Sequence, residues 1–208
     1  MPRYIAPLVL TATLALTGCE VVDAGTTGAP APTEATDSRA QLDDLTVAAA
    51  GSMKNYSREK FPHWRDTGSN CDVRDSVLER DGEKVKRSGC NVVAGTWRSL
   101  YDGEVLNSPT KVDIDHMVPL ANAWRSGAAK WDNDKRGDFA NDLERPQLIA
   151  VSASSNRSKG DQDPSTWKPS DRDSWCTYAK DWVTVKSYWK LTVTEKEKVA
   201  LDDMLETC

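Results

Sequence analysis

Residues 111–116, with the sequence KVDIDH, alternate charged and apolar side chains. This alternation constrains the fold more than any other feature of the chain, because a period of two predicts a β-strand with one buried face. The predicted strand ends in Asp115 and His116, so two polar side chains follow an otherwise half-apolar run. An isolated Asp-His pair is more often structural than catalytic. The residues that lie around the pair in the fold determine which of these roles it has.

A second apolar strand is predicted for residues 147–151, and the serines after it favour a helix that carries Asn156 and Lys159. If the two strands form a hairpin, the end of the first strand lies beside this helix. A carboxylate, an imidazole, an amide and an ammonium group then share one small pocket. Hard oxygen ligands favour Mg²⁺ or Mn²⁺, and the ordinary pKa of a histidine suits a general base.

The rest of the chain is expected to mix short helices with strands, which places the domain in the α+β class. Short helices are predicted for residues 40–50, 121–128 and 133–143, and for the segment CDVRDSVLERDG. Strands follow, with turn signals at Asp81-Gly82 and Asp102-Gly103.

The C-terminal part of the chain is predicted to be helical. Its apolar residues recur every three or four positions and form one face; they are Trp175, Tyr178, Trp182, Val185 and Trp189. Packing in the core is the simpler interpretation of this face, and ligand stacking is the alternative. Thr194 and Glu197 form a capping-box signature for a last helix.

Residues 1–18 are typical of an export signal, because a short positive region precedes an apolar segment too short to remain as a membrane span. The segment ends in LTGC, which resembles a bacterial lipobox, and this resemblance implies a lipid on Cys19. The predicted location is outside the cell, anchored to the outer face of the membrane or secreted without a lipid. Residues 19–39 are predicted to form a flexible tether, and residues 40–208 one domain.

Four further cysteines in an exported chain predict two disulfides. Sequence proximity favours Cys71 with Cys90 and Cys176 with Cys208 among the three possible pairings. A zinc site is the rival interpretation, but no Cys-x-x-Cys spacing supports it.

The net charge of −5 argues against a protein that coats nucleic acid by electrostatics alone. This net charge is still compatible with an enzyme that binds phosphate at one local site. Residues 145–160 support this possibility, because they contain Arg145, Arg157 and Lys159 but no acidic residue.

The motifs DIDHMVPL, NDL and SSNRSKGD, in this order, resemble those of HNH endonucleases, the ββα-metal superfamily. The branch of greatest similarity is the C-terminal domain of GmrSD-type restriction enzymes, which also occurs as stand-alone exported bacterial proteins. The upstream segments YSREKF, CDVRDSVLERD and GTWRSLYDG extend the resemblance over residues 55–208, with the core motif at 111–160. The resemblance implies a ββα-metal finger within a mixed domain that has C-terminal helices.

The resemblance also implies roles for individual residues. His116 matches the general base, and Asp115 matches a metal ligand. Asn141 matches the middle Asn, which orients the loop and the catalytic histidine. Asn156 occupies the position of the last metal ligand, where many members have histidine, and its harder amide oxygen favours Mg²⁺ or Mn²⁺. Lys159 matches a basic residue near the phosphate.

Four other polar residues receive less specific predictions. Arg157 and Arg74 are candidate substrate contacts, the latter because the family pattern carries an arginine there. Asp113 is predicted to tie down a loop, with support of the metal ligands as the alternative. His63 is predicted to be structural, with a substrate contact as the alternative.

The function that follows is an exported, metal-dependent endonuclease of low sequence specificity that uses one divalent ion. Its expected partners are nucleic acid, with DNA favoured over RNA, and the membrane through Cys19; a monomer is expected. The alternative is a non-catalytic surface lipoprotein that binds a ligand through its tryptophan-rich face. A second rival is a structural cell-envelope protein that its disulfides stabilise.

Overall fold

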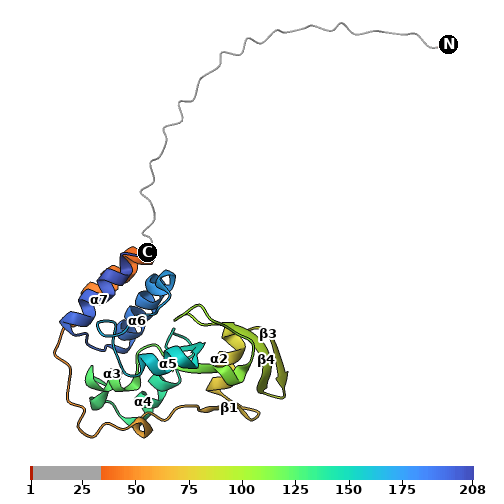
Figure 1. The fold of residues 1–208 in the computed structure, drawn as a ribbon, viewed down its shortest axis with the longest axis horizontal. Helices are drawn as coiled ribbons and strands as arrows, with labels where there is room; N and C mark the ends of the chain where they lie inside the picture. Colours follow the sequence, from red (N-terminus) through yellow and green to blue (C-terminus); the bar gives the residue numbers. More distant parts are fainter. Residues whose placement is uncertain (2–33) are drawn as a thin grey trace. The chain divides into compact units, whose positions relative to one another are not determined.

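The computed structural model describes Met1 and residues 34–208, and every element of secondary structure lies in the unit formed by residues 32–208 (Figure 1). The α-helices are α1 (Glu34–Asp44), α2 (Val73–Asp81), α3 (Leu120–Arg125), α4 (Asn133–Ala140), α5 (Ala153–Lys159), α6 (Trp175–Trp189) and α7 (Glu195–Leu205). The strands are β1 (Asp66–Gly68), β2 (Cys71–Asp72), β3 (Glu83–Ser88), β4 (Asn91–Arg98), β5 (Val105–Leu106), β6 (Val112–His116) and β7 (Leu148–Ser152). Short 3₁₀ turns span Arg58–Lys60, Pro109–Lys111, Ala128–Lys130 and Arg172–Ser174. The predicted signal peptide, Cys19 and most of the predicted tether lie outside the described residues.

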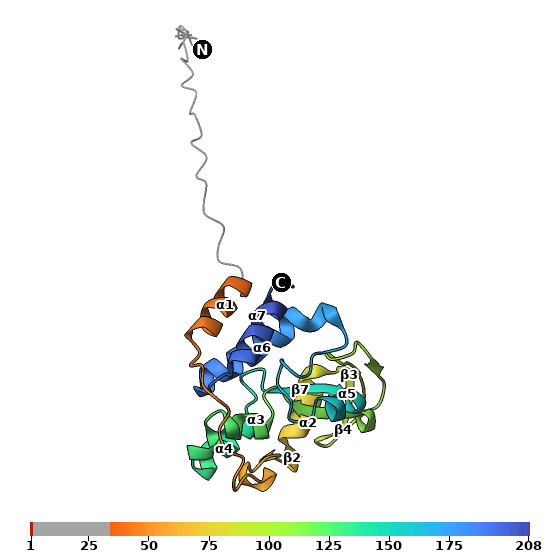
Figure 2. The same cartoon turned by 60° about the vertical axis from the view of Figure 1, so that its left-hand side comes forward.

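The strands form three small antiparallel sheets, in the orders β1-β2, β3-β4-β5 and β6-β7. Figures 1 and 2 show α1, α6 and α7 grouped together, with β3, β4 and α2 on another side of the domain. Helices and antiparallel sheets therefore occupy largely separate regions, which confirms the predicted α+β class.

The β6-β7 sheet lies between two hydrophobic clusters. One face carries Val112 and Ile114, which pack with Leu148 and Ala150 against α2 and β4. The other face carries Val151, which belongs to the larger cluster built from α1, α3, α4, α6 and α7. Because both faces are covered, β6 is more deeply buried than the half-buried strand that its alternation predicts.

Two predicted helices have different bounds in the structure. The first begins at Glu34 and ends at Asp44, since the chain after it is drawn out: Val47 forms an isolated bridge with Val193, and the Ala48 amide donates to the Val193 carbonyl. The helix predicted for residues 121–128 is broken by Gly127, whose φ of 139° is not helical, and continues as a 3₁₀ turn.

The disulfides join Cys71 to Cys90 and Cys176 to Cys208, which confirms the pairing that sequence proximity favours. They close segments of 19 and 32 residues. In the chain-entropy description, loops of these lengths stabilise the folded state by about 3–4 kcal/mol each.

The aromatic face of α6 is core. Tyr178 and Trp182 are fully buried and Trp189 is 9% exposed, so these three rings pack in the core and are not available to stack on a ligand. Trp175, at the start of the helix, is partly buried against the same core. The capping box at Thr194 and Glu197 is present at the start of α7, as predicted. Glu197 also accepts hydrogen bonds from the indole of Trp182 and pairs with Lys186, both inside the core.

The carboxylate of Asp181 on α6 makes the stability of the fold depend on pH. Its burial raises its pKa from 3.8 to about 7, although Lys180 and Arg80 act in the opposite direction. The folded state therefore retains a proton that the unfolded state releases between these two values. The resulting stabilisation is present at low pH and is lost as the pH rises through about 7.

We expect Asp181→Asn to remove this loss of stability, because an amide does not ionise. The measurement is the free energy of unfolding in urea at a series of pH values between about 5 and about 8. The exposed Asp203→Asn on α7 is the matched control and should follow the wild-type curve. Parallel curves for the wild type and Asp181→Asn would contradict the prediction.

Candidate active site

Asp115 is held by two donors at the junction of β6 and α5. Its Oδ2 atom accepts a hydrogen bond of 2.6 Å from the hydroxyl of Tyr101 and lies 2.5 Å from the Nζ atom of Lys159. Lys159 is fully buried, and its ammonium also donates to the His116 carbonyl at 2.9 Å. Burial lowers the pKa of Lys159 although the carboxylate opposes the shift, and burial raises the pKa of Tyr101 well above its usual value. Tyr101 is therefore a protonated donor, and the Asp115 Oδ1 atom has no hydrogen-bond partner within residues 34–208.

Asn156 on α5 is oriented by Asp113. Its Nδ2 atom donates to the Asp113 Oδ2 atom at 3.1 Å, and since a carboxylate accepts only, the amide oxygen points away from this bond. Asp113 therefore supports Asn156 directly, which is the alternative that the sequence analysis ranked second. The preferred interpretation assigns Asp113 to holding a loop in place, whereas in the structure its carboxylate bonds to a side chain of helix α5.

His116 is a buried, neutral imidazole with a defined tautomer. Its Nε2 atom lies 2.9 Å from the Ala140 carbonyl, which can only accept, so Nε2 carries the proton and Nδ1 carries the lone pair. Burial lowers the pKa of His116 to about 3, and the bond to Ala140 opposes this shift without reversing it. This value lies well below the ordinary histidine pKa on which the predicted role of general base relies, so His116 is a weaker base in this arrangement than the sequence predicts. The side chain is 3% exposed and lies against the rings of His63 and Trp64, with centroid separations of 6.2 and 6.0 Å.

Asn141 fixes the carbonyl that contacts His116. It is the C-cap of α4, next to Ala140, and its Nδ2 atom donates to the carbonyls of Pro62 and Gly137 at 2.7 and 2.6 Å. Its Oδ1 atom accepts from the backbone amide of Arg65 at 3.0 Å. The bonds to Pro62 and Arg65 tie the end of α4 to residues 62–65, so Asn141 reaches His116 through the backbone and not by direct contact.

Asp115, His116 and Asn156 line one cavity of about 250 Å³, together with residues of the loop before β1 and of α3. Tyr56, Arg58 and Asp161 are the other polar residues of its lining. Asp115 Oδ1 and Asn156 Oδ1, which accept no hydrogen bond within residues 34–208, are donors that could hold a hard cation here. No group of three or more His, Cys, Asp or Glu residues within the described part of the chain could hold a metal ion.

Sequence reasoning assigned no role to Tyr101, Tyr56 or Arg58. Tyr101 stands in an apolar segment before a turn, where a tyrosine indicates core packing, and only its hydroxyl contact with Asp115 reveals its place in the site. Arg58 lies in the segment YSREKF, at the start of a 3₁₀ turn. A charged residue there gives no indication that it lines a pocket whose other residues come mostly from much later in the sequence.

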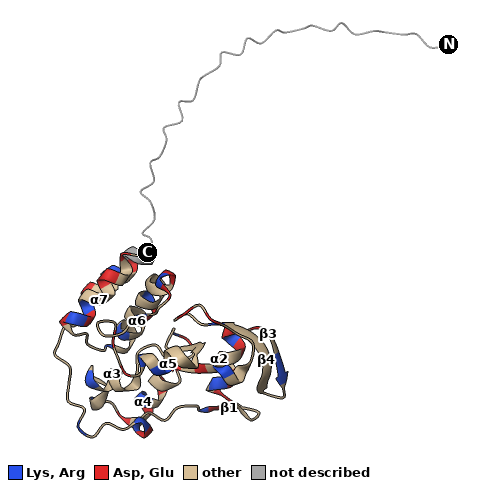
Figure 3. Cartoon of the chain, viewed as in Figure 1, with Lys and Arg blue, Asp and Glu red and all other residues tan. Residues whose placement is uncertain are grey.

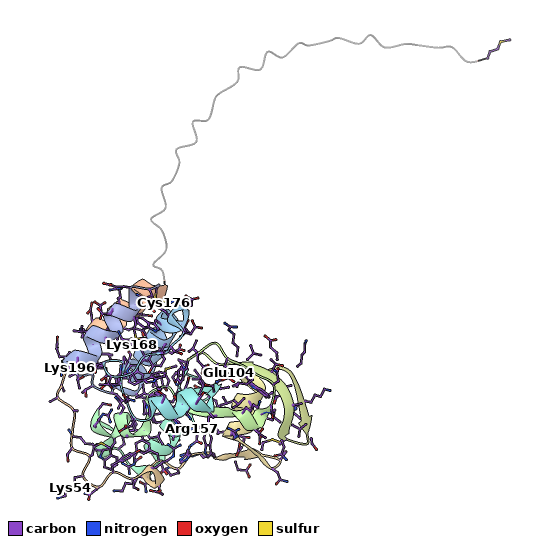
Figure 4. All side chains as sticks on the ribbon, in the orientation of Figure 1. Lys54, Glu104, Arg157, Lys168, Cys176 and Lys196 are labelled. Atoms are coloured by element: carbon purple, nitrogen blue, oxygen red, sulfur yellow. A yellow bond between two sulfur atoms is a disulfide. The ribbon has the colours of Figure 1, made fainter. Side chains whose placement is uncertain are left out.

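The other three predicted residues, Arg157, Arg74 and His63, lie in three different environments. The Arg157 side chain is exposed on α5 (Figure 4) and makes no hydrogen bond within residues 34–208, so it is available to a ligand. Arg74 is not, because its guanidinium donates to the carbonyls of Pro109 and Val112 and fixes the start of β6. His63 packs against Trp64 and His116, and its Nδ1 atom lies 2.7 Å from the Phe61 carbonyl.

Lys159 also differs from its prediction. Its ammonium is enclosed and paired with Asp115, so it cannot contact a phosphate in this arrangement. The ion pair instead fixes the carboxylate on which the site depends.

With this geometry established, the chain can be assigned to a family. It belongs to the family described as the C-terminal domain of GmrSD restriction endonucleases, which matches residues 69–204. The match includes β6 and α5 and therefore the residues that line the cavity from these two elements. It confirms the family that the sequence motifs resemble.

An uncharacterized secreted protein of Arthroderma benhamiae is 48% identical over 188 residues, which cover 88% of this chain and 92% of the relative. Its fungal source gives no support to the bacterial lipoprotein part of the prediction. No solved structure matches the chain. Among the helices that the structure describes, none has both the length and the apolar character needed to cross a membrane.

We expect Lys159→Met to destabilise the domain by about 3–5 kcal/mol, because it leaves the buried carboxylate of Asp115 without its cation. Arg157→Gln, on the same helix but exposed, should change stability by no more than about 0.5 kcal/mol. The measurement is denaturant unfolding of both variants. Equal stabilities for the two would show that Lys159 is not part of a buried ion pair.

Proposed function

We propose that this protein is an exported, metal-dependent endonuclease that hydrolyses phosphodiester bonds in nucleic acid, with DNA the favoured substrate. The observation that carries the proposal is the state of His116, a neutral histidine with a free Nδ1 atom. It is fixed beside two oxygens that have no hydrogen-bond partner in the described part of the chain. Membership in a family of restriction endonuclease domains supports this class of reaction.

The metal in this proposal is Mg²⁺ or Mn²⁺. Asp115 and Asn156 would hold it, and two oxygen donors suit an ion that keeps several waters and binds substrate phosphate at its other positions. The β6-β7 sheet followed by α5 has the element order of a ββα-metal finger, and both donors come from it. When bound, the ion supplies stabilisation of the negative charge that develops on the phosphate and the leaving oxygen.

The residues of this chain perform the proton transfer and the positioning. The Nδ1 atom of His116 accepts a proton from water, the resulting hydroxide attacks phosphorus, the bond from phosphorus to the 3′ oxygen breaks, and the departing 3′ oxygen takes a proton from solvent water. The products carry a 5′ phosphate and a 3′ hydroxyl. Ala140 fixes the tautomer of His116, and Asn141 positions Ala140. Lys159 and Tyr101 hold one oxygen of Asp115 so that the other is left for the ion.

Low sequence specificity is part of the proposal, because nothing in the motifs resembles a base-reading helix or a zinc finger. Export is also proposed, from the signal-like residues 1–18 and from the description of the fungal relative as a secreted protein. Two disulfides fit an oxidising compartment. A lipid on Cys19 would anchor the protein to the outer face of the membrane.

We expect the domain of residues 34–208 to nick and then linearise supercoiled plasmid in Mg²⁺ or Mn²⁺, and EDTA to stop the reaction, because the charge on the scissile phosphate needs a cation. Gel analysis of plasmid over time measures the result. An inert protein across a panel of divalent metals, with both DNA and RNA, would refute the nuclease proposal.

Variants should separate the base from the ligands. His116→Ala should lower the cleavage rate by about 10²–10⁴ and leave Mn²⁺ affinity unchanged, since it removes only the proton acceptor. Asn156→Ala should weaken Mn²⁺ affinity, and high Mn²⁺ should restore part of the rate by mass action. Asp115→Ala should weaken it too, but this variant leaves the Lys159 ammonium buried without its partner, so its affinity is compared only after circular dichroism shows a folded protein. Calorimetric Mn²⁺ binding beside cleavage rates tests this assignment. Loss of metal binding in His116→Ala, with binding kept in Asn156→Ala, would reverse the roles.

A further inference from the structure

A cavity of about 650 Å³ beside the candidate active site is lined by basic residues. This basic groove is defined by its cationic lining residues Lys54, Lys60, Arg125, Lys130 and Arg136. No acidic residue of the described chain lines it, although the chain as a whole has a net charge of −5. Figure 3 shows basic positions on α3 and α4, on the side of the domain away from β3 and β4.

Most of this positive charge has no counter-ion among the residues that the structure describes. Within residues 34–208, ion pairs involve neither the three lysines of the groove nor Arg136; Arg125 alone pairs, with Asp161 at 3.2 Å. Arg136 is 8% exposed, yet its acceptors are the neutral oxygens of Lys60, Ala128, Trp131 and Asn133. A guanidinium kept buried without a carboxylate leaves its full charge to attract an anion.

The wall of the groove also contains a hydrogen-bond donor without an acceptor. The buried indole N–H of Trp124 has no hydrogen-bond acceptor in the described part of the chain. Lys60 places its ammonium 5.2 Å from the centre of the Trp124 ring, so this cation is held by an aromatic face and not by a carboxylate. A surface of this kind is complementary to a ligand that only accepts hydrogen bonds, such as a phosphodiester.

The basic groove and the active-site cavity share two walls. Along the loop before β1, Lys54 and Lys60 line the groove while Tyr56 and Arg58 line the cavity. Along α3, the first turn lines the cavity and Trp124 lines the groove. The rings of Tyr56 and Trp124 touch, with centroids 5.8 Å apart. A polymer that enters the active site can therefore continue into the groove without leaving the surface.

We infer that the basic groove binds the phosphate backbone of the substrate strand next to the cleavage site. This inference rests on the proposed nuclease function and specifies where flanking nucleotides lie. Lys54, Lys130 and Arg136 supply the charge, and phosphates that occupy the groove release counterions from the nucleic acid. Long strands that span both the cavity and the groove bind more tightly than short ones that fill the cavity alone.

The test is a double variant of the whole chain, Lys54→Gln with Lys130→Gln, because both side chains are exposed and their loss should not affect folding. The matched control is Lys86→Gln with Lys196→Gln, which removes the same charge elsewhere; Figure 4 shows Lys54 and Lys196 at separate edges of the domain. Binding of a labelled single-stranded DNA of about 30 nucleotides is followed by fluorescence anisotropy in EDTA. Log affinity decreases linearly with log salt, and the magnitude of this slope should be smaller by about 1.4 in the groove variant, about 0.7 for each lost phosphate contact. The control should keep the wild-type slope.

Cleavage gives a second readout. The groove variant should show a raised KM with unchanged kcat on the long strand, and wild-type values on a strand of about 4 nucleotides, which is too short to span both sites. A labelled RNA of equal length should show the same loss of binding, since the shared ligand is the phosphate backbone. Competition by polyglutamate as effective as that by DNA would overturn the inference in favour of an acidic peptide partner.

The two proposals fail in different ways. If the wild type cleaves no nucleic acid but its DNA binding depends on Lys54 and Lys130, the groove stands and the nuclease proposal falls. If the wild type cleaves and the groove variant matches the control in salt slope and KM, the nuclease proposal stands and the groove inference is wrong.

Discussion

The buried ion pair between Asp115 and Lys159 is the interaction on which the candidate site depends. Removing two charges from water costs several kcal/mol for each ion, and only close contact with further hydrogen bonds offsets that cost. Here the ammonium also reaches the His116 carbonyl, and the carboxylate also accepts from Tyr101. The pair therefore joins β6, α5 and the segment after β4, so the position of each element constrains the other two.

This arrangement divides the chemistry of one carboxylate between its two oxygens. The Oδ2 atom of Asp115 is committed to the protein, and the Oδ1 atom is left free within the described chain. His116 is divided in the same way, because its Nε2 atom is committed to Ala140 and its Nδ1 atom is free. In both residues a buried partner fixes one polar atom, and the proposed mechanism assigns the reactive role to the other. The contacts that hold Asp115 and His116 thus orient the site, although only two side-chain oxygens are proposed as metal ligands.

The order of the central elements could be predicted from the sequence because it depends on local pattern. Alternation indicated β6, an apolar run indicated β7, and serine caps indicated the start of α5, so the residues with which β6 and α5 line the cavity were found. The state of Lys159 could not be predicted in this way, since lysine is almost never fully buried unless it is paired, and its partner is remote in sequence. The bounds of α1 were missed for a similar reason: the bridge from Val47 to Val193 competes with the helix, and it joins the two ends of the domain.

The ion pair also limits the paths along which this site can change in evolution. Loss of Lys159 alone leaves a buried anion, and loss of Asp115 alone leaves a buried cation, so each single step passes through a poorly folded intermediate. Tyr101 is coupled to both, because its hydroxyl needs the carboxylate as an acceptor. These three positions should therefore be inherited as a unit, and a descendant that abandons catalysis should replace them together, with residues that fill the same volume without charge.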